Sequence, residues 1–148
     1  MIGDVGIASE SVTVEFPIAE VFDFLADGTN NALWRPEVVS VIFAAGPPEQ
    51  AVWAQTVKSA NGRAHKADYR ISWYDHPGTL ELTVFNGPSR PTTTFGLRSL
   101  TGSTTEVTCT VDVKPRFYPL ERTRFGTTAA RALANEILNL GAAMAKRA

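Results

Sequence analysis

The sequence predicts an α+β fold in which a seven-stranded, curved antiparallel sheet wraps around a long C-terminal helix, with two short helices after the first strand. Three observations carry this prediction. Apolar and polar residues alternate in seven segments that end at turns, and the spacers are short enough for hairpins. The last third of the chain changes to a helical period. A curved sheet closed on one helix buries the apolar faces of both.

The first strand and the first helix lie in residues 11–27, "SVTVEFPIAEVFDFLAD". Residues 11–16 alternate between apolar and polar side chains, which is typical of a half-buried strand. Pro17 ends this strand and suits the first turn of a helix. Residues 18–27 then carry apolar side chains at helical spacing. Gly28 is expected to end that helix.

A second short helix is expected to run through Trp34, capped by Thr29 or Asn30, whose side-chain oxygens accept orphan backbone N–H groups. Pro36 disfavours a helical conformation at Arg35, so the chain extends there. A large aromatic residue therefore stands at a hinge between a helix and a strand. Two interpretations stay open: Trp34 lies at the entrance to a cavity, or it fills core between helix and strand.

Six further strands are expected after this hinge, each ended by a turn. The dipeptide Asn61-Gly62 separates two of them and is a strong hairpin signal. The expected strands cover residues 38–43, 51–58, 65–74, 79–85, 92–100 and 105–113.

The C-terminal helix is expected to begin near Pro119, with Glu121 close to the positive end of the helix dipole. Its apolar stripe is graded from small residues to large ones along the helix. The stripe holds Gly126, Ala130, Leu133, Ile137, Leu140 and Met144. If the sheet keeps its distance along the helix, the small end leaves a cavity. The alternative is that the sheet approaches more closely at the small residues.

Strand alternation predicts which side chains line this cavity. The predicted wall is apolar and aromatic with few polar groups, which suits an oily or ring-shaped small molecule. One β-bulge would invert the alternation, and Trp73-Tyr74 is the place where this matters most. Each aromatic taken singly also fits an ordinary core. The candidate ligand-binding residues are Trp34, Trp53, Gln55, Tyr69, Ile71, Trp73, Thr93, Phe95, Cys109, Arg122, Gly126 and Ala130.

Composition is that of an ordinary globular domain: 148 residues, 44% hydrophobic and 20% charged, with a net charge of -1. Nothing in this balance favours nucleic acid or an anionic membrane as a partner. Residues 114–148 are basic, with seven Lys/Arg against two Glu for a local charge of +5. A solvated helix face explains this better than a binding patch.

Cys109 is the single cysteine, so no internal disulfide can form, which fits a reducing compartment. The N-terminal residues lack the basic start and apolar stretch of a secretory signal. No run of about 18 apolar residues is present. We therefore expect a cytoplasmic protein without stable membrane insertion, either a monomer or a homodimer.

Several segments together carry a resemblance to a known family. They are "SVTVEFPIAEVFDFLAD", Trp34 with "PEVVSV", "YRISWYDHPG", "TEVTCTVDVKP" and the closing helix. Over roughly residues 8–146 the chain resembles the START-like (SRPBCC) superfamily, in its polyketide cyclase/dehydrase and lipid-transport branch. The resemblance implies one START-like domain over residues 1–148. It also implies a helix-grip fold with a hydrophobic cavity between sheet and helix. Members include lipid and hormone carriers and aromatase/cyclases.

Two loops depart from the pattern of the family. The segment "DHPGTLEL" stands where members often have a basic, proline-rich turn, and "DGTNNAL" replaces a proline-containing loop. Because these loops border the expected entrance, the resemblance leaves the ligand open.

Residues able to catalyse a reaction are scarce on the expected inner surface. Tyr69 is the only obvious inward titratable group, and Arg122 lies near the expected mouth, where it could pair with a ligand carboxylate. No Ser/His/Asp order suggests a triad, and one Cys with two separated His residues predicts no metal site. Glycine-rich phosphate loops are absent, so no cofactor is expected.

Three functions are compatible with these observations. The first is a carrier or binder of a small hydrophobic molecule without catalysis, which the scarcity of proton-transfer groups favours. The second is a cyclase/aromatase-type enzyme, which the family resemblance implies, with Tyr69 and Arg122 steering a polyketide-like chain. The third is a regulatory protein–protein module that uses the basic end near Arg116, Arg122 and Arg124.

Overall fold

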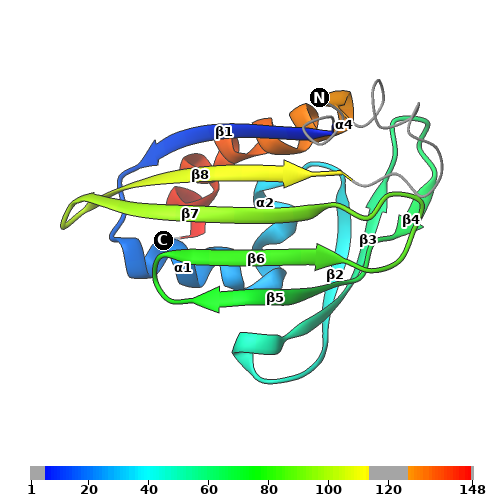
Figure 1. The fold of residues 1–148 in the computed structure, drawn as a ribbon, viewed down its shortest axis with the longest axis horizontal. Coiled ribbons are helices and arrows are strands. Elements are labelled where there is room, and N and C mark those ends of the chain that lie inside the picture. The colour runs from blue at the N-terminus through cyan, green and yellow to red at the C-terminus, as the bar shows by residue number, and fades with distance from the viewer. Residues whose placement is uncertain (1–5, 114–126, 148) are drawn as a thin grey trace.

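An antiparallel sheet with a helical layer on one face forms the described part of the chain, residues 6–113 and 127–147 of a computed structural model (Figure 1). The predicted α+β architecture, with the sheet wrapped around a C-terminal helical segment, is confirmed. The strands are β1 Ile7–Val14, β2 Val38–Ala45, β3 Val52–Lys58, β4 Ala64–Lys66, β5 Tyr69–Asp75, β6 Thr79–Val84, β7 Thr92–Thr101 and β8 Thr104–Asp112.

The strand order across the sheet is β1-β8-β7-β6-β5-β3-β2, and the short β4 pairs with β3. The described residues thus form eight strands where seven were expected, because the predicted strand 65–74 is interrupted. At the interruption the backbone N–H of Gln55 donates to the Asp68 carboxylate at 3.0 Å instead of to a strand carbonyl. Asn86 donates to the other oxygen of this carboxylate at 2.9 Å. A side chain therefore replaces one step of the backbone ladder.

The helices after β1 are α1 Ile18–Ala26, the 3₁₀ turn η2 Gly28–Asn30 and α2 Asn31–Trp34. The prediction that Thr29 or Asn30 caps the second helix is wrong. The Asp27 carboxylate accepts the backbone N–H of Thr29 at 3.0 Å, so Asp27 is the capping residue of η2. Asn30 instead donates its side-chain amide to the Phe24 carbonyl at 3.0 Å, which fixes α2 against the end of α1.

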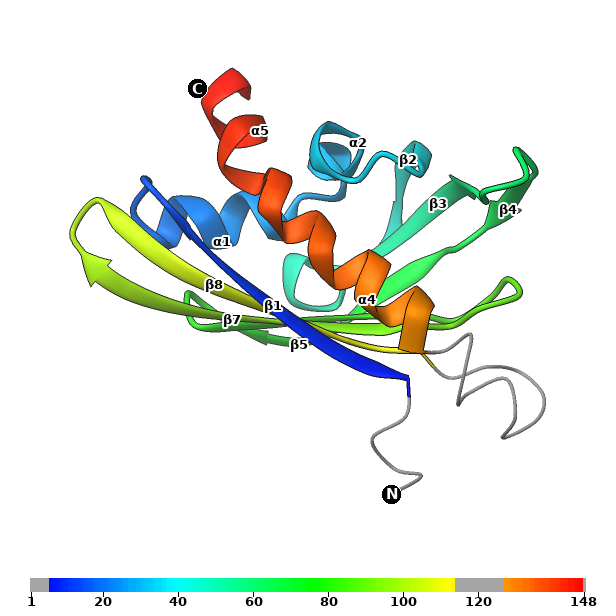
Figure 2. The same ribbon diagram turned by 90° about the horizontal axis from the view of Figure 1, so that it is seen from above.

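The C-terminal segment consists of α4 Thr127–Asn135, the 3₁₀ turn η5 Glu136–Asn139 and α5 Leu140–Arg147. Figure 2 shows this segment running across the concave face of the sheet. The predicted helix start near Pro119 lies outside the described residues. None of the helices in the described ranges is long and apolar enough to cross a membrane.

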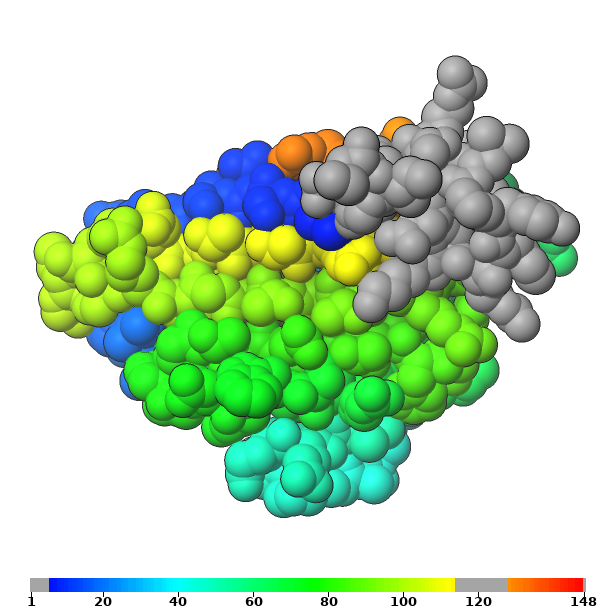
Figure 3. Space-filling model, in the orientation of Figure 1, coloured from blue at the N-terminus to red at the C-terminus, as the bar shows by residue number. Residues whose placement is uncertain are grey.

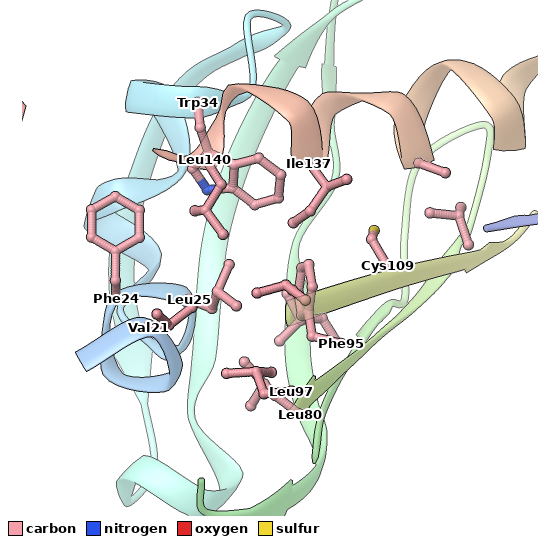
Figure 4. Packing of buried hydrophobic residues seen from close by; sticks show 14 of the residues in the cluster. Val21, Phe24, Leu25, Trp34, Leu80, Phe95, Leu97, Cys109, Ile137 and Leu140 are labelled. Carbon is pink, nitrogen blue, oxygen red and sulfur yellow. The ribbon is translucent and has the colours of Figure 1, made fainter. Parts of the chain in front are cut away.

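The core lies between this helical segment, α1 and the inner face of the sheet. In Figure 4 Ile137 and Leu140 point from the C-terminal segment toward Phe95 of β7, and Leu25 of α1 closes the same space. Trp34 belongs to this core, with its ring edge-on to Phe95 at 6.0 Å between centroids. Asn139 donates to the Trp34 carbonyl at 3.0 Å, which ties α2 to η5.

The opposite face of the sheet is turned to solvent. Figure 3 shows this face, with β8, β7 and β6 side by side and the residues of the η3 turn, Pro48–Gln50, projecting beyond them in cyan. The predicted inward position of Trp73 is wrong. A β-bulge between Ile71 and Trp73 inverts the alternation, leaving Trp73 59% exposed and turning Tyr74 inward against Phe22.

Gly28 gives a testable consequence of this packing. A Cβ atom at residue 28 would lie 2.5 Å from Cδ2 of Trp53 and 2.6 Å from the Tyr69 hydroxyl. Both rings are buried, so neither can move aside freely. We expect Gly28→Ala to lower the free energy of unfolding by about 1–3 kcal/mol, measured by urea denaturation.

Gly96→Ala is the matched control, because a Cβ atom there meets nothing within 4 Å. Its stability should equal or slightly exceed that of the wild type, since Ala reduces the freedom of the unfolded chain. Equal stabilities for both variants would contradict close packing at Gly28.

Candidate functional site

A cavity of about 150 Å³ lies between α4 and the strands β3 and β6, and extends to the segment before β7. Its apolar wall consists of Val57, Ala67, Val84, Pro91 and Leu133. Three polar side chains complete the lining on one side, namely Arg35, Glu37 and Gln55, and Ser89 lies exposed at its rim. The site is therefore mostly apolar with polar groups gathered at one end, as small-molecule sites commonly are.

Arg35 is held between two carboxylates at the polar end. Its Nη2 lies 3.2 Å from Oε2 of Glu37, and its Nε lies 3.2 Å from Oε1 of Glu136. The three side chains are only 13–20% exposed. Arg35 has an extended backbone conformation because Pro36 follows it. Arg35 and Glu37 are two residues apart in this extended stretch, and both side chains reach Glu136.

Two carboxyl groups share one cation here, so they compete for it. Burial, followed by the hydrogen bond with Glu37, raises the pKa of Glu136 to about 9. Burial acts in the same direction on Glu37, but the hydrogen bond with Glu136 and the charge of Arg35 outweigh it and lower the pKa of Glu37. Near neutral pH the cluster therefore holds Arg35 as a cation, Glu37 as an anion and a proton on Glu136.

Behind this cluster a second set of polar side chains is linked by hydrogen bonds. The side-chain amide of Asn31 donates to Oε1 of Gln55 at 3.0 Å and to the Tyr69 hydroxyl at 2.9 Å. Gln55 in turn donates Nε2 to the Ala67 carbonyl at 3.2 Å. Burial raises the pKa of Tyr69 to about 12, so the phenol stays protonated. This network fixes Gln55 in the cavity wall.

Of the residues predicted to bind ligand, the structure places some in the cavity wall and others in the core. Gln55 lies in the wall of the cavity beside Leu133. Four others are buried in the core and are not among the residues of the described cavity walls: Trp34, Ile71, Phe95 and Cys109. Burial also raises the pKa of the Cys109 thiol to about 12, so this thiol is not a reactive nucleophile. Tyr69 is buried behind the wall, and Thr93 is half-buried opposite Leu82.

Trp53 lines a different hollow, of about 350 Å³, between α1 and the segment that joins β2 to β3. Phe43 covers its ring edge-on at 5.4 Å between centroids. A further hollow of about 300 Å³ lies between α1 and α5. Both are larger than the cavity under α4, but they are open depressions of the surface. The cavity under α4 is the better candidate because it is more enclosed and a buried charged cluster lies in its wall.

The small residues of the helix do not border this cavity within the described chain. Ala130 is fully buried, because α4 packs directly on β1 and β8. The sheet thus approaches the helix at its small residues, and the cavity lies instead beside Leu133, over β3 and β6. Arg122 and Gly126 lie outside the described residues, as do Arg116 and Arg124.

Sequence reasoning missed the charged cluster. One signal could have found Glu136: it lies three residues after Leu133 and four before Leu140, which places an acid on the apolar face of the helix. Such an acid needs a buried partner, and Arg35 beside Trp34 was available in the predicted hinge. The pairing itself spans 101 residues and leaves no local signal.

The cluster is not a metal site. In residues 6–113 and 127–147 no three His, Cys, Asp or Glu side chains are grouped as metal ligands would be. Arg35 occupies the space between the two carboxylates, so a cation already neutralises them.

Comparison with known proteins identifies related folds. The profile of the family described as polyketide cyclase / dehydrase and lipid transport matches residues 6–148. No curated protein matches the sequence.

Three solved structures illustrate the likeness, and at these identities they support the fold alone. The Zhui aromatase/cyclase from Streptomyces sp. R1128 superposes with a TM-score of 0.77 at 19% identity, over 96% of this chain and 95% of that chain. A START superfamily protein from Mycobacterium smegmatis superposes with a TM-score of 0.69 at 17% identity, over 89% of this chain and 94% of that chain. The human StarD13 (DLC2) lipid transfer and protein localization domain superposes with a TM-score of 0.72 at 13% identity, over 93% of this chain and 76% of that chain.

The shared proton predicts how stability depends on pH. The raised pKa of Glu136 means that the folded state binds this proton more tightly than the unfolded chain, whose carboxyl titrates near 4.5. The stabilisation is fully present below pH 4.5 and is lost as the pH rises toward about 9. Glu136→Gln mimics the protonated form. The difference between its melting temperature and that of the wild type should therefore shift in favour of the variant as the pH rises from 4.5 to about 9.

Thermal melts at pH 5, 7 and 9 test this prediction. Glu37→Gln is the reciprocal variant, because it leaves Glu136 as the sole carboxylate beside Arg35 and should flatten the dependence as well. Parallel curves for the wild type and Glu136→Gln would show that no proton is shared.

Proposed function

Because the chain belongs to the polyketide cyclase / dehydrase and lipid transport family, we propose that it binds a small hydrophobic molecule in the cavity between the sheet and α4. The observation that carries this proposal is the cavity itself, whose apolar wall of Val57, Val84 and Leu133 faces a buried polar cluster. Small-molecule sites are commonly clefts of this kind, mostly apolar with a few polar groups at one end.

The size of the cavity limits the ligand. A volume on the order of 150 Å³ lined by aliphatic side chains admits one aromatic ring or a short branched chain. A long acyl chain does not fit within the described walls. The bound group is therefore compact, or it is the end of a longer molecule that leaves past Ser89 and Pro91.

Binding without catalysis is the function that we favour. Tyr69, the predicted inward acid, accepts a hydrogen bond from Asn31 behind the wall and keeps its proton, because burial raises its pKa to about 12. It is not among the residues that line the cavity. Arg122, the other candidate, lies outside the described residues.

A cyclase-type enzyme is the second candidate, favoured by the proton that Glu136 shares with Glu37, since Glu37 lines the cavity and connects this proton to it. A general acid near neutral pH is what such a reaction uses. If turnover of a polyketide-like substrate is found, Glu136→Gln should abolish it and Tyr69→Phe should not. The regulatory module, the cytoplasmic location and the oligomeric state stay predictions from the sequence.

Filling the cavity tests the proposed function. Toluene, a one-ring hydrophobe, should bind the wild type and shift the nuclear magnetic resonances of Val57, Val84 and Leu133. Val57→Phe places a ring in the same space and should weaken toluene binding at least about tenfold, because the apolar area available to the ligand is lost.

Val39→Phe is the matched control, since Val39 is 54% exposed on β2 and does not line the cavity. It should bind toluene as the wild type does. If toluene shifts none of the lining residues in the wild type, or if Val57→Phe binds it equally well, the cavity is not a ligand site.

A further inference from the structure

The polar end of the cavity determines which ligands it accepts. Resting on the proposed function, we propose that the ligand is electrically neutral and carries a hydroxyl group that donates a hydrogen bond to the Glu37 carboxylate. The proposal goes beyond a hydrophobic cavity because it names the recognition residue and excludes ligands with an anionic head. It rests on which polar atoms of the wall are already paired and on the charge balance around Arg35.

Gln55 offers the ligand little. Its Oε1 accepts from Asn31 and its Nε2 donates to the Ala67 carbonyl, at 3.0 and 3.2 Å. The Asn31 amide that holds it also donates to the Tyr69 hydroxyl. Turning Gln55 toward a ligand would break both of its bonds in a buried place, which costs more than one new bond returns. One N–H of the amide is left over and can only donate, so Gln55 is not the group that accepts a hydrogen bond from a ligand hydroxyl.

Glu37 is different because it has unused acceptor capacity. Its Oε2 accepts from Nη2 of Arg35 at 3.2 Å, and its Oε1 is buried with no N–H donor in the described part of the chain, so the proton of Glu136 is the donor left to it. A carboxylate offers about four acceptor positions. Arg35 and the proton of Glu136 fill two of them. A hydroxyl group in the cavity can fill a third at the exposed part of the side chain, since Glu37 lines that cavity and is 20% exposed.

The charge balance excludes an anionic ligand. Arg35 is the cation of the lining among the described residues, and its Nε and Nη2 already face Glu136 and Glu37. A ligand carboxylate would bring a third acid to one buried cation and would lie beside the charge of Glu37. The loss of its own hydration would then go uncompensated. A neutral hydroxyl avoids both costs and adds a hydrogen bond to the Glu37 carboxylate.

Three one-ring probes that differ in one substituent test the proposal: phenol, toluene and benzoate. Phenol has the donor, toluene has a methyl group of similar size without a donor, and benzoate has the anionic head. Dissociation constants from chemical-shift titration at pH 7 should place phenol about tenfold tighter than toluene, as expected for a hydrogen bond to a charged acceptor. Benzoate should show no binding at concentrations where phenol saturates.

The variant Glu37→Gln tests whether Glu37 is the cause of the preference for phenol over toluene. This variant removes the charge from the acceptor, so the advantage of phenol over toluene should fall to within about twofold while toluene binding is kept. Glu15→Gln, at an exposed position outside the cavity, is the matched control and should keep the wild-type order. The wild-type constants decide whether a hydroxyl donor is preferred, and if Glu37→Gln does not fold, the shorter acid of Glu37→Asp should reduce the advantage of phenol in its place.

The possible results separate this inference from the proposed function. Toluene binding as tight as phenol, or benzoate binding as tight as either, overturns the inference and leaves a hydrophobic cavity in place. A phenol preference that persists in Glu37→Gln overturns the assignment to Glu37. If none of the three probes shifts Val57 or Leu133, the proposed function fails and the inference fails with it.

Discussion

The ion cluster of Arg35 with Glu37 and Glu136 is the constraint on which the rest of the site depends. Arg35 stands at the hinge between α2 and β2, and Glu136 stands where α4 gives way to η5. A buried guanidinium is tolerated only when its charge and its N–H groups are matched, so these two distant segments must meet at this point. Their meeting places the helix beside the cavity and supplies its polar end.

The cavity results from an uneven approach of the helix to the sheet. On one side α4 packs against β1 and β8 (Figure 2), and Ala130 and Ala134 are fully buried. On the other side Leu133 faces β3 and β6 across the hollow. Small side chains therefore let the helix sit close to one half of the curved sheet, and the curvature leaves the other half at a distance. The position of the hollow follows from this asymmetry.

Fold alone does not decide the function of this chain, because both an aromatase/cyclase and a lipid transfer domain superpose on it. What distinguishes it is the chemistry at one end of the cavity. The Asn31 amide donates to both Gln55 and Tyr69, which holds this part of the wall in place. The neighbouring carboxyl pair shares a proton beside Arg35, and this is the part of the site to which we assign discrimination between ligands.

The sequence by itself determined the order of strands and helices, the wrapping of the sheet around a C-terminal helix and the burial of Gln55, because periodicity is a local property that short windows reveal. The interruption of the strand at Asp68 and the bulge at Trp73 depended on contacts between neighbouring strands, and the prediction was incomplete or wrong at each. The cap was also predicted wrongly, although Asp27 and Thr29 are only two residues apart. The ion cluster and the site of the cavity were decided only by the tertiary structure. Arg35 and Glu136 are 101 residues apart, and whether a helix meets a sheet depends on how both are curved and tilted.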